Sequence, residues 1–331
     1  MEEEDDDVLD NFRNIGNLDK FFQNLFLLKG KKLESRKSVI IFDEVQLFPK
    51  ARQAIKKLVK DGRFDYIETG SLISIRQNVK DILIPSEEHH LKMFPLDFEE
   101  FLESTGNEFA CNAIREAFAT KIPLSDAVHR RMMELFRTYM AVGGMPQAVV
   151  AYVEGKTYDE IDSIKQDIIT LHENTLKKYD SENREKSSQV FKVIPEQLNK
   201  RNAAFKFSLI DKNARYRNFV DAVDFVAESM IGNICINVTE PGIAMELNAD
   251  RSNFKLYQGD TGLFVTQMMK LENKENLYKS IIFDKISSNL GILYENVVAQ
   301  MLTCNGRSLY FHAFKYHPQG QEQEKNMRLI F

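Results

Sequence analysis

The stretch VIIFDEVQ (Val39–Gln46) constrains the fold of this chain more than any other. Four apolar residues, rich in β-branched side chains, run directly into Asp43 and Glu44. A short continuous apolar run of this kind predicts a strand buried on both faces of a parallel sheet. An amphipathic helix over residues 51–59 and a second strand, FDYIETGS (Phe64–Ser71), follow it. Together they predict a βαβ unit with a right-handed crossover.

The carboxyl ends of these two strands carry the candidate site, because ligands of parallel sheets bind there. Asp43 and Glu44 follow the first strand, and Thr69, Gly70 and Ser71 end the second. In a nucleotide-hydrolysing site the first acid, here Asp43, holds Mg²⁺ and the next, Glu44, orients the attacking water. Gly70 would lie against the nucleotide, and Ser71 would sense its terminal phosphate. The alternatives are a strand that runs into a polar turn and, for Ser71, an ordinary turn residue.

Such a site needs a phosphate-binding loop, G-x-x-x-x-G-K-[ST], whose backbone N–H groups and lysine cradle the phosphates. No stretch before Val39 matches this motif. The nearest, LLKGKKLES (Leu27–Ser35), has one glycine and no strand leading into it. Magnesium ligands without that cradle are expected to bind nucleotide weakly or not at all.

The next part of the sequence is predicted to be helical. FPLDFEEFLE (Phe94–Glu103) begins a helix that Asp97 caps, and Glu100, three residues on, completes a capping box. The helical pattern then continues to Tyr179 with a break at GGMP (Gly143–Pro146), because a glycine pair followed by proline ends a helix.

A helix–helix–ribbon pattern follows. Helices within Ile194–Asn202 and Ala214–Gly232, with strands Ile234–Val238 and Phe254–Gly259, form the outline of a winged helix-turn-helix. Basic side chains around these helices would contact DNA phosphates and make binding salt-dependent. They are Lys200, Arg201, Lys206, Lys212, Arg215 and Arg217. Alternatively, the module packs against neighbouring domains. A further helix within residues 289–302 and a strand, SLYFHAF, complete the pattern.

Composition narrows the function classes. The net charge of 44 − 49 = −5 argues against a surface covered with nucleic-acid-binding charge, although a local basic face fits it. No apolar run approaches the roughly 20 residues of a membrane helix, so we expect no membrane partner. The acidic start, MEEEDDD, is neither a signal nor a transit peptide, which predicts a cytoplasmic protein. Nothing in the sequence indicates an oligomeric state.

The run from Val39 to Leu102 resembles a prokaryotic family of AAA+-type ATP-binding proteins. RTYMAVGGMPQAV, the IPEQLNKRN region, FKLYQGDTGL and GILYENVVAQML resemble further landmarks of that family in order. The resemblance implies ATP and Mg²⁺ as cofactors, with Asp43 and Glu44 as the magnesium and water-activating acids and Ser71 at the sensor position. It makes Arg76 and Arg137 candidate phosphate-sensing arginines, although solvated arginines are the alternative.

The resemblance also implies the domain organisation. The expected fold class is α/β plus α+β, with a partial parallel-sheet AAA+ (P-loop NTPase-like) domain at 1–105, which lacks the phosphate loop, and a helical lid at 106–180. A winged-helix module at 181–275 and the start of a restriction-endonuclease-like domain at 276–331 would follow. Glu295 begins that last domain, where a glutamate can bind metal; a leftover or surface residue is the alternative that we favour.

Two departures from the family suggest that the chain is truncated at both ends. Family members carry the phosphate loop upstream of the first residues seen here, and they continue the tail with Glu-Ile-Asp-Phe. The codons of Met327–Phe331, read in another phase, can encode those four residues, so we expect a frameshift. Three functions follow as hypotheses: an ATP-binding protein, a DNA-binding or nuclease-related component, and an inactive remnant.

Overall fold

The protein is described by a computed structural model that covers residues 3–45, 48–70, 88–179, 185–200, 204–269, 278, 280–282, 290–316 and 325–330. The chain forms two compact units, Met1–Lys92 and Met93–Phe331, which we call the first and the second unit. No helix in the described part of the chain is both long and apolar enough to span a membrane.

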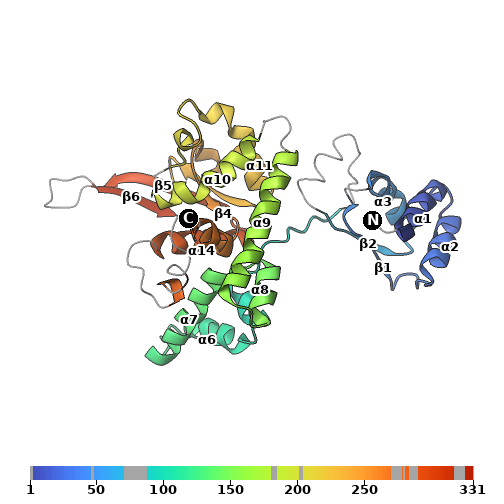
Figure 1. Cartoon of the computed structure of the whole chain (residues 1–331), viewed down its shortest axis with the longest axis horizontal. Coiled ribbons are helices and arrows are strands. Elements are labelled where there is room, and N and C mark those ends of the chain that lie inside the picture. Colours follow the sequence, from blue (N-terminus) through green and yellow to red (C-terminus); the bar gives the residue numbers. More distant parts are fainter. Residues whose placement is uncertain are drawn as a thin grey trace. The chain divides into compact units, whose positions relative to one another are not determined.

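The first unit contains the predicted βαβ arrangement (Figure 1). Strands β1 and β2 pair in parallel, from Val39 opposite Asp65 to Phe42 opposite Glu68, and helix α3 connects them. Two helices precede them, and the fold prediction for this part is confirmed. The bounds are α1 Glu3–Asn11, α2 Leu18–Lys29, β1 Val39–Phe42, α3 Pro49–Asp61 and β2 Asp65–Glu68.

Only one face of this two-stranded sheet is covered by the described residues. Its inner face packs on an aromatic cluster that includes Phe21, Phe22 and Leu58. Val39 and Ile41 on the outer face remain 48% and 61% exposed. The prediction of a strand buried on both faces was therefore wrong for the described structure. An unbroken apolar run shows that both faces avoid water but does not say what covers them.

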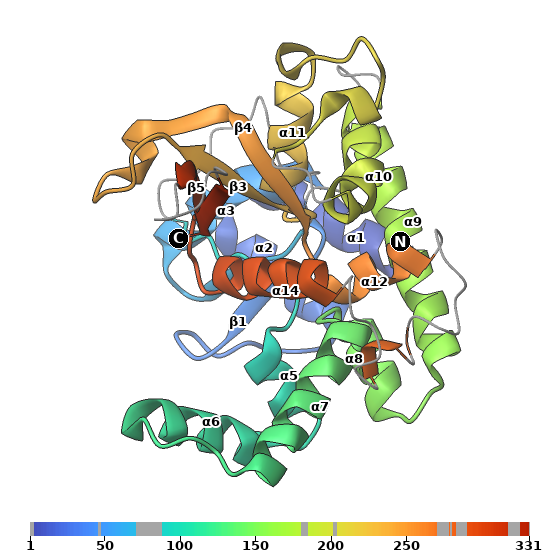
Figure 2. The same ribbon diagram turned by 90° about the vertical axis from the view of Figure 1, so that its left-hand side faces the viewer.

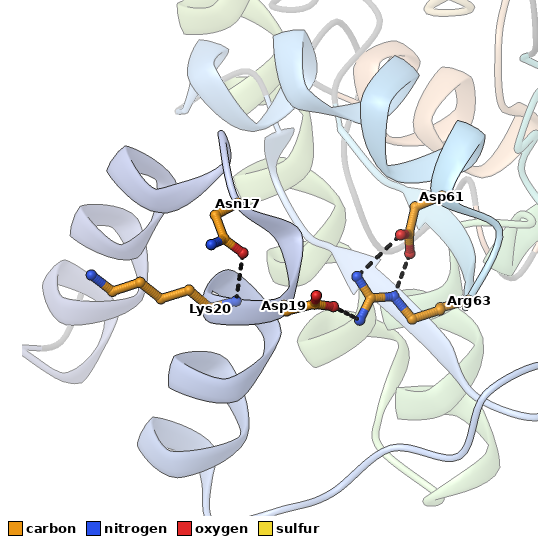
Figure 3. Close-up of polar contacts among 5 residues, drawn as sticks. All are labelled: Asn17, Asp19, Lys20, Asp61 and Arg63. Carbon is orange, nitrogen blue, oxygen red and sulfur yellow. Dashed lines mark hydrogen bonds and ion pairs between the residues drawn. The ribbon is translucent and has the colours of Figure 1, made fainter.

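Arg63 holds helix α2 against the turn between α3 and β2 (Figure 3). Its guanidinium donates to Asp61 at 2.6 Å and to Asp19 at 2.9 Å, and it lies 4.7 Å from the ring centre of Phe22. Asn17 caps the same helix by accepting from the Lys20 N–H at 3.2 Å. These contacts fix the start of β2, and with it the register of the sheet.

The helical part of the second unit follows the sequence prediction closely. The Asp97 carboxylate accepts from the Glu100 N–H at 3.0 Å, and Glu100 accepts from the Asp97 N–H at 2.9 Å, so the predicted capping box is present. The GGMP break lies between two helices, as predicted. The helices are α5 Phe98–Ser104, α6 Glu108–Thr120, α7 Asp126–Val142, α8 Pro146–Val153 and α9 Tyr158–Tyr179. Helix α5 belongs to this unit, although the sequence analysis grouped residues up to 105 with the N-terminal domain.

A four-stranded sheet in the order β4-β3-β5-β6 forms the rest of the second unit. Strand β3 is antiparallel to β4 and parallel to β5, and β6 is antiparallel to β5. Helices α10 and α11 contact β4 and β3, and α14 lies along the sheet (Figure 2). The bounds are α10 Lys186–Asn199, α11 Val220–Glu228, β3 Gly232–Val238, β4 Ala249–Gln258, α12 Thr261–Met269, α14 Leu290–Cys304, β5 Leu309–Tyr316 and β6 Lys325–Ile330.

The pairing of β3 differs from the outline expected for a winged helix. Strands β3 and β4 form the predicted antiparallel ribbon, but β3 lies between β4 and β5 inside one sheet. The ribbon is therefore not a separate wing, and the expected boundary at 275/276 falls between strands of one sheet. Pairing between β3 and β5 is a non-local contact, which periodicity along the chain does not reveal.

Close backbone contacts join the helices to this sheet. The Gly144 N–H donates to the buried Asp260 carboxylate at 2.6 Å, and Leu96 N donates to Gly144 O at 2.8 Å. Gly143 has φ +88°, and a Cβ there would lie 2.4 Å from Asp260 Oδ1. Glycines are required at this turn because two backbone segments meet without room for side chains.

A buried charged group lies in the same core. Lys165 is fully buried and donates to Ala141 O and to the Tyr278 hydroxyl, both at 2.7 Å. Asp162 accepts from the Tyr278 hydroxyl at 3.0 Å and from the Thr266 hydroxyl at 2.6 Å. Burial lowers the pKa of Lys165 to about 8. These bonds compensate in part for taking a charge out of water.

Candidate functional site

The candidate site lies where β1 and β2 end. Backbone pairing continues one step beyond both strands, because Thr69 N donates to Phe42 O at 2.9 Å and Val45 N donates to Thr69 O at 3.0 Å. Asp43 and Glu44 stand in the turn that these two bonds close. The βαβ topology thus places both acids beside the residue that ends the neighbouring strand, as the sequence predicted.

Thr69 links the two acids directly. Its hydroxyl donates to Asp43 Oδ1 and accepts from the Glu44 N–H at 3.2 Å. Both carboxylate-bearing residues are exposed, and Glu44 has φ +51°, a left-handed conformation that non-glycine residues adopt infrequently. The site therefore presents two solvent-accessible carboxylates on a constrained turn.

A buried arginine supports the end of β2. Arg52 on α3 forms ion pairs with Glu68, the residue before Thr69, and with Glu88 at 2.7 Å. Its side chain is 7% exposed, so this pairing neutralises charge that would otherwise be costly to bury. The sequence analysis missed Arg52. Its position three residues before Ile55 and six before Leu58 puts it on the buried stripe of the helix, which was the available signal.

The remaining predicted site residues are placed as follows. Gly70 follows Thr69 and is exposed. Ser71 and Arg76 lie outside the described residues. Arg137 lies on α7 of the second unit and is half-buried. Of the predicted site, the described structure brings together Asp43, Glu44 and Gly70.

Two further predictions concern the second unit. Glu295 on α14 accepts from the buried Lys255 ammonium at 2.8 Å and from the Tyr257 hydroxyl at 3.2 Å, so it is an ion-pair partner in this fold. Most of the predicted basic residues of the connector are exposed: Lys200, Lys206, Lys212, Arg215 and Arg217. Lys200 pairs with Glu196 at 2.6 Å, and Arg201 lies outside the described residues.

The donors at the candidate site have the chemistry that magnesium requires. Mg²⁺ is usually held by one or two carboxylates together with phosphate oxygens and waters, not by a full protein cage. Asp43 supplies an exposed carboxylate, and Thr69 supplies a hydroxyl beside it. Across the described residues, no group of three or more His, Cys, Asp or Glu side chains is arranged to hold a metal ion. A site with one protein carboxylate would not produce such a group.

Comparison with known families agrees with this geometry. Residues 2–102 match the family model of the AAA domain, and residues 133–275 match a domain of unknown function (DUF8612). No curated protein matches the chain. The N-terminal part of this protein is therefore an AAA-type domain, and β1, α3, β2 and the two acids all lie within it.

Proposed function

We propose that the first unit is a nucleotide-binding domain and that the carboxyl ends of β1 and β2 form its magnesium and water-orienting site. The observation that carries the proposal is the exposed acid pair Asp43 and Glu44, tied to Thr69 at the end of the neighbouring strand in an AAA-type domain. Parallel α/β sheets bind their ligands at this edge.

Each acid has a defined role in this proposal. Asp43 would hold Mg²⁺, which neutralises charge on the phosphates when it is bound. Glu44 would orient a water molecule toward the terminal phosphate, since an exposed carboxylate accepts hydrogen bonds from water. Arg52 carries neither role, because its guanidinium is buried against Glu68 and Glu88.

The expected affinity is low. The sequence contains no G-x-x-x-x-G-K-[ST] motif, so the nucleotide phosphates would lack the backbone cradle and lysine of that loop. We therefore expect a Kd for magnesium–ATP of roughly 1 mM, about 4 kcal/mol of binding free energy.

Magnesium-dependent binding of a fluorescent ATP analogue to the full chain tests the proposal. Asp43→Asn should weaken binding at least about tenfold in the presence of Mg²⁺ and leave it unchanged in EDTA. Asp65→Asn is the matched control, because Asp65 is an exposed acid at the opposite end of β2. Equal Mg²⁺-dependent binding by wild type and Asp43→Asn would refute the proposal.

A second candidate function is nucleic-acid binding by the connector between α10 and α11. Lys206, Lys212 and Arg217 are exposed there, and among the described residues none of the three forms an ion pair. Affinity for a DNA duplex should then fall with salt, and Lys212→Glu should reduce the slope of log K against log salt by about 1. Lys60→Glu, an exposed lysine on α3, is the control. Binding that is insensitive to both salt and Lys212→Glu would exclude this function.

A further inference from the structure

The hydroxyl of Thr69 makes two different hydrogen bonds at once. A threonine hydroxyl has one proton to donate and lone pairs that accept. Here the proton goes to Asp43 Oδ1, and a lone pair accepts the Glu44 N–H at 3.2 Å. One side chain therefore contacts the carboxylate of the first acid and the backbone of the second.

The backbone of Thr69 is fixed independently of its side chain. Its N–H donates to Phe42 O at 2.9 Å, and its carbonyl accepts from Val45 N at 3.0 Å. These bonds attach Thr69 to the residues on both sides of the acid pair. The hydroxyl is thus held by the sheet rather than by the exposed turn that it contacts.

The turn at the acids needs such a restraint. Glu44 has φ +51°, where the Cβ of a glutamate is crowded by its own backbone. Conformations of this kind persist only when the surrounding structure holds them. The bond from the Glu44 N–H to the Thr69 hydroxyl holds this residue from outside the turn.

We infer that Thr69 is the positioning residue of the site, on the basis of the function proposed above. Its hydroxyl orients the Asp43 carboxylate so that Oδ1 is engaged and Oδ2 is the oxygen presented to a cation. Through the Glu44 N–H it also sets the direction in which the second acid leaves the turn. Thr69 touches neither nucleotide nor water in this arrangement, so it acts through the two acids.

Three variants of the full chain separate the hydroxyl from the rest of the side chain. Thr69→Val keeps the shape and removes both hydrogen bonds, whereas Thr69→Ser keeps the hydroxyl and loses the methyl group. Asp43→Asn tests the proposed function itself. Amide exchange of the β1 and β2 residues, measured for each variant, shows whether the sheet is intact.

The first measurement needs no ligand. Amide exchange of Glu44, followed by NMR or mass spectrometry, should accelerate about five- to tenfold in Thr69→Val and stay near wild type in Thr69→Ser, because one hydrogen bond is lost only in the valine variant. Unchanged exchange of the Glu44 amide in Thr69→Val would overturn the assignment of that bond.

The second measurement is the Mg²⁺ concentration that gives half-maximal binding of the fluorescent ATP analogue. Thr69→Val should raise it about 10- to 100-fold, as loss of a residue that orients a metal ligand does, and Thr69→Ser should restore it to within about threefold. If Asp43→Asn weakens binding but Thr69→Val does not, the role of Thr69 is refuted while the proposed function stands. If Asp43→Asn has no effect, the proposed function itself fails. Equal losses in the valine and serine variants would assign the effect to packing and refute a role for the hydroxyl.

Discussion

Replacing Gly144 by alanine should destabilise the second unit more than most single substitutions. A Cβ at this position would lie 2.0 Å from Leu96 O and 2.8 Å from Leu96 N, and both are backbone atoms that cannot rotate away. The segment at Leu96 must therefore move. That movement breaks its bond to Gly144 O, 2.8 Å long, and the bond that the Tyr139 hydroxyl donates to Leu96 O, also 2.8 Å.

The expected magnitude follows from these contacts. Two lost hydrogen bonds contribute about 1 kcal/mol each. Overpacking of a filled site adds about 1–3 kcal/mol. The sum, about 3–5 kcal/mol, is a large part of the roughly 5–15 kcal/mol that stabilises a typical domain. Backbone conformation adds little, because Gly144, unlike Gly143, is not in the left-handed region.

Chemical denaturation combined with hydrogen exchange of peptides that contain Leu96 measures this effect. Gly291→Ala is the matched control, since this glycine lies on α14 with no atom within 4 Å of an added Cβ. It should stabilise the unit by about 0.5–1 kcal/mol through helix propensity. A Gly144→Ala variant that stays within about 1 kcal/mol of wild type, with Leu96 still protected, would refute the close packing of this turn.

Three further predictions concern titration and capping. Burial lowers the pKa of Lys165 from 10.5 to about 8, so between these values the unfolded chain binds a proton that the folded chain does not, and stability should rise with pH. Relative to Lys165→Met, the rise should approach about 1.4 kcal/mol per pH unit in denaturation experiments, and the comparison cancels the opposing effect of Cys304, whose pKa burial raises to about 12; equal slopes would contradict it. Burial likewise lowers the pKa of His172 from 6.5 to about 4, so stability should fall as the pH drops through this range, and a His172→Leu variant that shows the same fall would exclude this histidine as the cause. Asp97→Ala removes the capping box and should cost about 1 kcal/mol in the same assay, whereas an unchanged midpoint would show that the cap contributes nothing.

Local structure could be predicted well from the sequence. The β1–α3–β2 unit, the capping box at Asp97 and the helix break at Gly143 all depend on residues close together in the chain. Side-chain periodicity, caps and glycine–proline turns encode such features directly, because they act within a few residues. The placement of Asp43 and Glu44 at a sheet edge followed from the same local reasoning.

The connections within the candidate site could be predicted only in part. The sequence placed Thr69 at the end of a strand, but its hydrogen bonds to Asp43 and Glu44 depend on the register of β1 and β2. Arg52 was missed because its partners, Glu68 and Glu88, are distant in sequence. A buried arginine looks like any other basic helix residue until its acids are known.

The sequence by itself determined which segments become helices and strands and which side chains end the first two strands. Only the tertiary structure decided that β3 pairs with β5 inside one sheet, that one face of the β1–β2 sheet is left exposed by the described residues, and that the Gly143–Gly144 turn closes on Asp260. The physical reason is that periodicity records how a segment faces its surroundings, whereas strand partners and close backbone contacts are chosen by non-local packing.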